Sequence, residues 1–173
     1  MVCGILYVKF QDDMTGVTGM RILVVSDTHG NVGALCRAIE QQPTAHAVIF
    51  LGDGLRDAWE AEKRYPERIF YTVPGNCDFG CHDPKIREET LGGKRFFFTH
   101  GHVFDVKYGL YRLDLAAREH KADIALFGHT HTPYEEYADG LYLFNPGSLG
   151  YGGTYGYVDV VGGGAVTQVV SLR

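Results

Sequence analysis

The chain has 173 residues, a hydrophobic fraction of 45% and a formal net charge of -5 at pH 7. This length suffices for one good hydrophobic core and is short for two ordinary domains, so we expect a single domain. The acidic balance argues against an extended basic groove for nucleic acid and against attraction to acidic lipid headgroups. No apolar run approaches the ~20 residues that cross a bilayer, and no signal-peptide pattern is seen, so we expect no membrane association.

The N-terminal 19 residues differ in texture from the rest of the chain. They contain one weak apolar run, ILYVKF, followed by a polar stretch with Gly and Thr that resembles a linker. A buried strand, RILVVS, follows Met20 directly, so residues 1–19 are interpreted as an extension that is non-native or loosely ordered, and residues 20–173 as the domain. The alternative is that ILYVKF adds an edge strand.

Apolar runs and segments of helical period alternate after Met20, which is typical of an α/β domain. We expect strands at 21–26, 46–52, 68–73, 94–100 and 123–128 and helices at 34–42, 55–65 and 110–120, with Asn31 as the N-cap of the first helix. Residues 133–145 and 154–172 alternate around Gly turns and are predicted to form antiparallel hairpins.

Polar side chains that can bind a metal ion follow each of the five predicted strands. They are Asp27, His29, Asp53, Asn76, Asp78, His100, His102, His129 and His131. In open α/β sheets, ligands bind in the crevice outside the carboxyl ends of the strands, so these groups should converge on one place. Residues i and i+2 of an extended segment point the same way, so Asp27 with His29, and His129 with His131, can each supply a pair of ligands. His46, His82 and His120 lack this context and are expected to be ordinary structural residues.

The motifs DTHG, GDG, GNCD, THGH and GHTH occur in that order between Met20 and the C-terminus. In this set the sequence resembles the calcineurin-like metallophosphoesterases. Its length, the GNCD form and the NPGS segment at 145–148 are similar to the small single-domain prokaryotic phosphodiesterase branch. The resemblance implies a four-layer sandwich of two mixed β-sheets flanked by helices.

The resemblance also implies a dinuclear metal site. By motif, Asp27, His29 and His131 would hold one divalent ion, Asn76, His100 and His129 the other, and Asp53 would bridge them. Two such ions polarise a phosphoryl oxygen and lower the pKa of a bridging water, so that hydroxide attacks phosphorus in line. The mixed N/O donor set suits transition metals, with Mn preferred and Ni, Co, Fe or Zn as alternatives.

One position departs from the family pattern. Cys77 stands where many members have a His that contacts the phosphate or the leaving group, so Asn76, Cys77 and His102 are assigned to substrate binding. His102 is a candidate phosphate ligand or acid, with a supporting role as the alternative, and Asp78 is expected to orient a neighbouring ligand or its water. Asp53, Asn76, Asp78 and His102 are therefore the candidate catalytic residues.

The leading functional hypothesis is a metal-dependent phosphodiesterase acting on a small or activated phosphoester substrate. The alternatives are a phosphomonoesterase for a nucleotide or sugar phosphate, and a protein-binding scaffold, because the fold resembles that of a retromer subunit. Four scattered cysteines are not a disulfide framework, which favours a reducing, cytoplasmic location. A substrate cleft or the interface of a homo-oligomer could be lined by Tyr108, Tyr111, Tyr151, Tyr155 and Tyr157, although aromatic residues in hairpins are usually core or ordinary strand residues.

Overall fold

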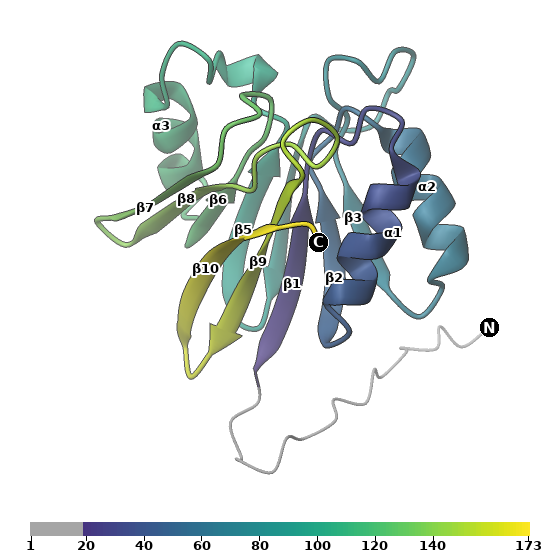
Figure 1. The fold of residues 1–173 in the computed structure, drawn as a ribbon. Helices are drawn as coiled ribbons and strands as arrows, with labels where there is room; N and C mark the ends of the chain where they lie inside the picture. The colour runs from purple at the N-terminus through teal and green to yellow at the C-terminus, as the bar shows by residue number, and fades with distance from the viewer. Residues whose placement is uncertain (1–18) are drawn as a thin grey trace, which may run out of the picture.

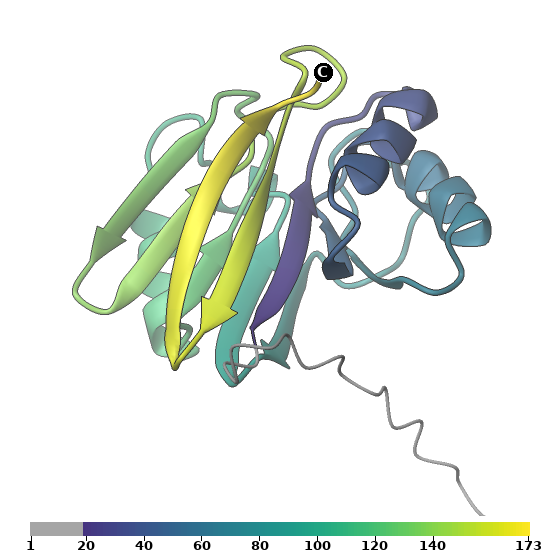
Figure 2. The same cartoon turned by 60° about the horizontal axis from the view of Figure 1, so that its bottom comes forward.

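A computed structural model describes residues 19–173, so the expected extension, including ILYVKF, lies almost entirely outside the described residues. Two five-stranded sheets pack face to face, and helices cover their outer surfaces (Figures 1 and 2). This is the four-layer α/β sandwich that the sequence motifs predict. Within the described part of the chain, no helix is long and apolar enough to span a bilayer.

The first sheet has the strand order β10-β9-β1-β2-β3. Strands β1, β2 and β3 are parallel, whereas β9 pairs antiparallel with both β1 and β10. Their bounds are β1 Met20–Val25, β2 Ala45–Phe50, β3 Ile69–Thr72, β9 Thr154–Val161 and β10 Gly164–Ser171. Helices α1 (Val32–Gln41) and α2 (Leu55–Arg64) cover its outer face.

The second sheet has the order β4-β5-β6-β8-β7. Here β5, β6 and β8 are parallel, and β4 and β7 are antiparallel edge strands. The bounds are β4 Ile86–Leu91, β5 Lys94–Thr99, β6 Ile124–Leu126, β7 Tyr134–Ala138 and β8 Leu141–Asn145, with a short 3-10 helix η1 (His102–Phe104) and α3 (Tyr111–Glu119) on the outside.

Strand periodicity builds three apolar layers from these elements. In β1, Ile22 and Val24 point into the core between the sheets, while Leu23 and Val25 pack beneath α1 and α2. In β5 the central Phe97 instead faces the α3 side. Because side chains alternate along a strand, each fully apolar strand is buried on both faces.

The predicted elements are confirmed with small shifts at their ends. The Asn31 side chain accepts a hydrogen bond from the amide of Ala34 at 3.0 Å, as expected of an N-cap. One strand was missed: β4 has the sequence IREETL, and its three consecutive charged residues hide an edge strand that has a single partner, β5. Such charges are common on edge strands, where they discourage pairing with other chains.

Candidate metal centre

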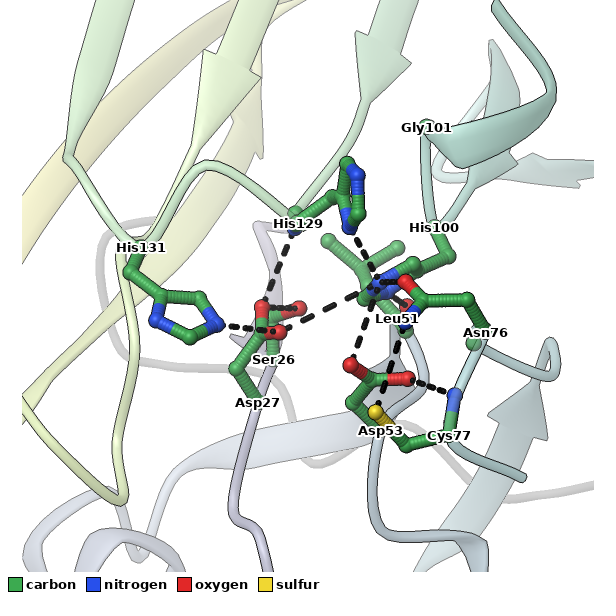
Figure 3. A network of polar contacts seen from close by, with 12 residues as sticks. Ser26, Asp27, Leu51, Asp53, Asn76, Cys77, His100, Gly101, His129 and His131 are labelled. Atoms are coloured by element: carbon green, nitrogen blue, oxygen red, sulfur yellow. Dashed lines mark hydrogen bonds and ion pairs between the residues drawn. The ribbon is translucent and has the colours of Figure 1, made fainter. Parts of the chain in front are cut away.

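The candidate ligands lie at one rim of the molecule, where the parallel strands of both sheets end. Asp27 follows β1, Asp53 follows β2 and Asn76 follows β3 of the first sheet, whereas His100 follows β5 and His129 follows β6 of the second. Figure 3 shows these side chains pointing toward one another across the gap between the sheets. The structure therefore brings together the groups that the sequence placed at strand ends.

One donor group combines Asp27, His29 and His131. The Nε2 atom of His131 lies 3.1 Å from Oδ1 of Asp27, and Nε2 of His29 lies 3.7 Å from the same oxygen. The two Nε2 atoms are 3.2 Å apart. Nitrogens held ~2.1 Å from a common ion are roughly 3.0–3.4 Å apart, so this spacing fits two ligands of one metal.

A second donor group surrounds His100. Its Nε2 atom lies 3.2 Å from Oδ1 of Asn76, 3.2 Å from Nδ1 of His129 and 3.5 Å from Oδ2 of Asp53. It is also 4.0 Å from Oδ1 of Asp27. Because Asp53 lies within reach of both groups, its position is compatible with the bridging role that the motif implies.

The protonation pattern of His100 is that of a metal ligand. Its Nδ1 atom lies 2.7 Å from the carbonyl oxygen of Leu51 and must donate its proton there, so Nε2 of the neutral ring carries a lone pair. A metal-binding histidine characteristically donates its other N–H to a carbonyl or carboxylate. His100 is completely buried, and its lone pair points at further donor atoms. A bound cation would stabilise these lone pairs, which otherwise face one another.

Asp27 gives a second, independent sign that this rim can bind a cation. Its side chain is fully buried, yet Oδ1 has no hydrogen-bond partner among the described residues, while Oδ2 accepts from the Ser26 hydroxyl and from the amide of His129 at 3.1 Å. An unpaired, buried carboxylate oxygen is costly unless it binds a cation. The residues at this rim therefore fit divalent metal ions.

Backbone strain is concentrated at the same residues. Eight non-glycine residues in the described chain have positive φ, and five of them are candidate ligands: Asp27, His29, Asp53, His129 and His131. Left-handed conformations cost non-glycine residues free energy and persist where the surrounding structure enforces them, often at functional sites. Close backbone approach adds to this constraint, since a Cβ on Gly75 would lie 2.0 Å from Oδ1 of Asp53.

Two further carboxylates hold the loops of the first sheet. Asp78 accepts hydrogen bonds from the amides of Asp53, Gly54, Leu55 and Gly75 at 2.8–3.0 Å. It thereby ties the turn after β3 to the start of α2. Asp57 in α2 accepts from the Thr28 hydroxyl at 2.6 Å and from the amide of Gly30 at 2.9 Å.

The NPGS segment clamps the two sheets at the rim. Asn145 donates to the carbonyl oxygen of Gly128 at 3.0 Å, and Ser148 donates to the carbonyl oxygen of Asp27 at 2.9 Å. Both side chains are fully buried. Tyr151, just beyond, stacks on His131 with ring centroids 5.4 Å apart and lies 4.8 Å from the ring of His29.

The electrostatics suit neutral imidazoles beside ionised carboxylates. Burial, then repulsion from His100 when both rings are protonated, lowers the pKa of His129 to about 4, so the His129 ring is neutral at pH 7. Burial alone would raise the pKa of Asp53, but His100 and the amide of Cys77, which donates to Oδ1 at 2.7 Å, bring it below its ordinary value. Burial, then its hydrogen bond to Asp53, raises the pKa of the Cys77 thiol to about 11.

The other sequence-derived candidates occupy distinct places. Cys77 is exposed, and its sulfur can join a donor group with His29 and Asp53. The ring of His102 lies 5.4 Å from that of His100, and its buried Nδ1 has no hydrogen-bond partner in residues 19–173. Burial, then His100, lowers the pKa of His102.

Some residues that do not follow a predicted strand lie away from the rim, and others lie at the rim although the sequence did not predict a role for them there. His120 pairs with Glu88 at 2.7 Å, away from the rim. Asp57 and Tyr151 reach the site, but sequence reasoning singled out only the tyrosine, as one of several in the hairpins. Two sequence signals could have pointed to these residues: the DxH motif, whose loop contacts Asp57, and the NPGS segment, which precedes Tyr151.

Comparisons with known proteins agree with this geometry. The family model described as "Calcineurin-like phosphoesterase superfamily domain" matches residues 20–161. The Escherichia coli (strain K12) protein named phosphodiesterase YfcE is 31% identical over 168 residues, covering 81% of this chain and 88% of that protein.

Two solved structures share the fold. A Streptococcus pneumoniae TIGR4 protein described as a predicted phosphoesterase superposes with a TM-score of 0.72 at 26% identity, covering 88% of this chain and 98% of that one. Vacuolar Protein Sorting 29 from Cryptosporidium parvum gives a TM-score of 0.68 at 16% identity, covering 88% and 97% of the two chains, which is a likeness of fold alone. The chain thus belongs to the calcineurin-like phosphoesterase superfamily.

Proposed function

We propose that this metallophosphoesterase is a phosphodiesterase that hydrolyses a small or activated diester with two divalent transition-metal ions. The observation that carries the proposal is the convergence of unprotonated donor atoms, above all the unpaired Asp27 Oδ1 and the Nε2 lone pair of His100. The name of its relative YfcE supports diester rather than monoester hydrolysis. Manganese is the first ion to test, followed by nickel, cobalt, iron and zinc.

In this proposal Asp27, His29 and His131 hold one ion, and Asn76, His100 and His129 hold the other, with Asp53 between them. When bound, the two ions polarise a phosphoryl oxygen and lower the pKa of a water molecule. The chain's own contribution is placement: Asp78 fixes the Asp53 loop, and the NPGS clamp fixes the Asp27 loop. His102 lies beside the second group, where its ring can contact the phosphate or donate to it.

Cys77 determines how the leaving group departs. Its thiol, with a pKa near 11, is a weak proton donor at neutral pH compared with the imidazole that occupies this position in many family members. Burial, then His100, lowers the pKa of His102, the other candidate acid, so that ring is largely unprotonated at neutral pH. The leaving oxygen then takes its proton from water, and we expect a steep dependence of rate on leaving-group pKa. The expected cytoplasmic location rests on cysteine usage, and a homo-oligomer stays a prediction.

Paired substrates with one leaving group test the proposal. Protein loaded with Mn²⁺ should hydrolyse bis(p-nitrophenyl) phosphate at least about tenfold faster than p-nitrophenyl phosphate, the discrimination that one good contact provides. A reversed preference would instead establish a phosphomonoesterase. Tight binding of two ions without turnover of either ester, for any of the five metals, would favour a scaffold.

A further inference from the structure

Beside the candidate metal centre, the rim carries an open hollow of about 540 Å³. It lies between the first turns of α2 and the turn at residues 77–81, which follows β3 and rises above α2 in Figure 1. His29, Asp53 and Cys77 line it, so the hollow is continuous with the donor groups. Its volume is that of a site for a small organic ligand.

Two aromatic side chains border this hollow without a structural task. Trp59 is 45% exposed and Phe79 is 91% exposed, and neither ring contacts another aromatic ring within residues 19–173. Large exposed aromatic groups around a hollow are typical of sites that stack planar ligands. The same two rings do little for the core, since both lie outside the three apolar layers.

Arg56 adds a charge to the same wall. Its guanidinium is exposed and has no hydrogen-bond or ion-pair partner among the described residues. The carboxylates of Asp57 and Asp78, which line the same hollow, instead accept hydrogen bonds from backbone amides and a hydroxyl. An unpaired arginine at the mouth of a site suits a phosphate group, which it can bind with two parallel hydrogen bonds.

We propose that the hollow binds the nucleoside part of the substrate, so that the enzyme acts on a nucleotidyl diester or pyrophosphate. The scissile phosphorus lies at the His29 and Asp53 end, the base stacks on Trp59 and Phe79, and in a pyrophosphate the second phosphate contacts Arg56. This rests on the proposed function and specifies its substrate class. In the reaction, the oxygen of water forms the new P–O bond, the bond to the leaving oxygen breaks, and the leaving oxygen takes up a proton from water.

Binding can be measured without catalysis because Trp59 is the only tryptophan of the chain. Its emission, excited at 295 nm, should be quenched by AMP and by ADP but not by ribose 5-phosphate, which lacks a base. ADP should bind about fivefold more tightly than AMP, and Arg56→Gln should abolish that difference. Phe79→Ala should weaken both nucleotides about tenfold, the loss expected for one base–aromatic contact.

Matched variants lie outside the hollow. Tyr137→Ala removes an aromatic ring that is 62% exposed on β7, and Arg37→Gln removes a guanidinium on α1; both should bind nucleotides as the wild type does. Equal affinity of the wild type for ADP and AMP would contradict the proposed contact between Arg56 and a second phosphate. An absence of quenching by either nucleotide would overturn the proposal.

Kinetics separate this proposal from the proposed function. Thymidine 5′-(p-nitrophenyl phosphate) and methyl p-nitrophenyl phosphate share a leaving group, and the first should have the lower KM by about tenfold, a preference that Phe79→Ala reduces. Turnover of both esters with equal KM would overturn the nucleoside site alone. Failure to hydrolyse either ester, with AMP still bound, would instead contradict the phosphodiesterase. Parallel assays with adenylyl adenosine, which has one phosphate, and ADP-ribose, which has two, would show whether the diester or the pyrophosphate is the preferred substrate.

Discussion

The two sheets meet at one rim, but they bring different chemistry to it. The first sheet supplies both carboxylates, Asp27 and Asp53, whereas the second supplies His100, His129 and His131. Each sheet alone would present an incomplete donor set. The apolar layer between the sheets, which includes Ile22 and Phe96, therefore does more than stabilise the fold, because it sets the distances between anionic and neutral donors.

The two sides of the rim are also held in different ways. On the first sheet, carboxylates bind backbone amides, as Asp78 does at four positions. On the second, neutral groups contribute most of the side-chain contacts: Asn145 donates to Gly128, and His100 donates to Leu51 of the first sheet, beside one carboxylate contact from Asp27 to the His129 amide. The first side is thus rich in negative charge and should depend on a cation, while the second side should persist without one.

The largest expected effect comes from removing charge on the first side. Asp27→Asn should lower kcat/KM at least about a hundredfold and reduce the bound metal measured by elemental analysis. In EDTA the variant should melt at or above the wild-type temperature, because carboxylate oxygens of Asp27 and Asp53 lie within 4.8 Å of each other and repel without a cation.

Asp139→Asn is a matched control, since Asp139 also has positive φ but lies in a hairpin turn away from the rim. It should leave both activity and metal content unchanged. A clear drop in the melting temperature of Asp27→Asn in EDTA would assign Asp27 a structural role that does not involve metal.

Two histidines of the second side sharpen the comparison. His100→Ala should lose metal and also destabilise the metal-free protein by about 2–4 kcal/mol, because it opens a buried cavity and leaves the Leu51 carbonyl unpaired. His131 is 36% exposed, so His131→Ala should lose metal with a change in unfolding free energy below about 1 kcal/mol. Urea unfolding in EDTA would measure both values, and equal losses would contradict the difference between the positions.

Much of this arrangement could be predicted from residue patterns. Uninterrupted Val, Ile and Phe runs indicate strands buried on both faces, and polar residues directly after each run then share one rim. The pattern fails where local signals are weak. Strand β4 carries three consecutive charged residues at an edge, and its residues Arg87 and Glu89 pair with each other instead of entering a core.

The supporting residues of the site were harder to predict. Asp57 and Asp78 act through amides that are distant in sequence, and that pairing depends on how two loops pack rather than on either loop alone. The hollow beside Trp59 likewise depends on how segments that are distant in sequence pack together. Helical periodicity places Trp59 on an exposed face, but only the folded chain brings Phe79 to the same opening.

A smaller effect is expected at Asp78, which supports the site without entering the donor groups. Asp78→Asn should cost about 1–3 kcal/mol of unfolding free energy, since a neutral amide replaces a carboxylate that accepts from four backbone amides. Metal affinity should fall about 10–100-fold at unchanged stoichiometry. Asp83→Asn, an exposed carboxylate in the same connection, is the control. Loss of a whole equivalent of metal would mean that Asp78 is itself a ligand.

The smallest effect should follow removal of residues 1–19, because the first described strand, which starts at Met20, already has a strand partner on each side. Strand β1 lies between β9 and β2, so no edge is free beside it, and an added strand would have to reach β10 or β3 of the same sheet, or β4 or β7 of the other. A chain starting at Met20 should melt within about 2 °C of the full-length protein and keep its turnover. The family model also begins its match at residue 20. A fall of about 4–8 °C, roughly 2 kcal/mol for a domain near this size, would show that ILYVKF pairs with one of the edge strands.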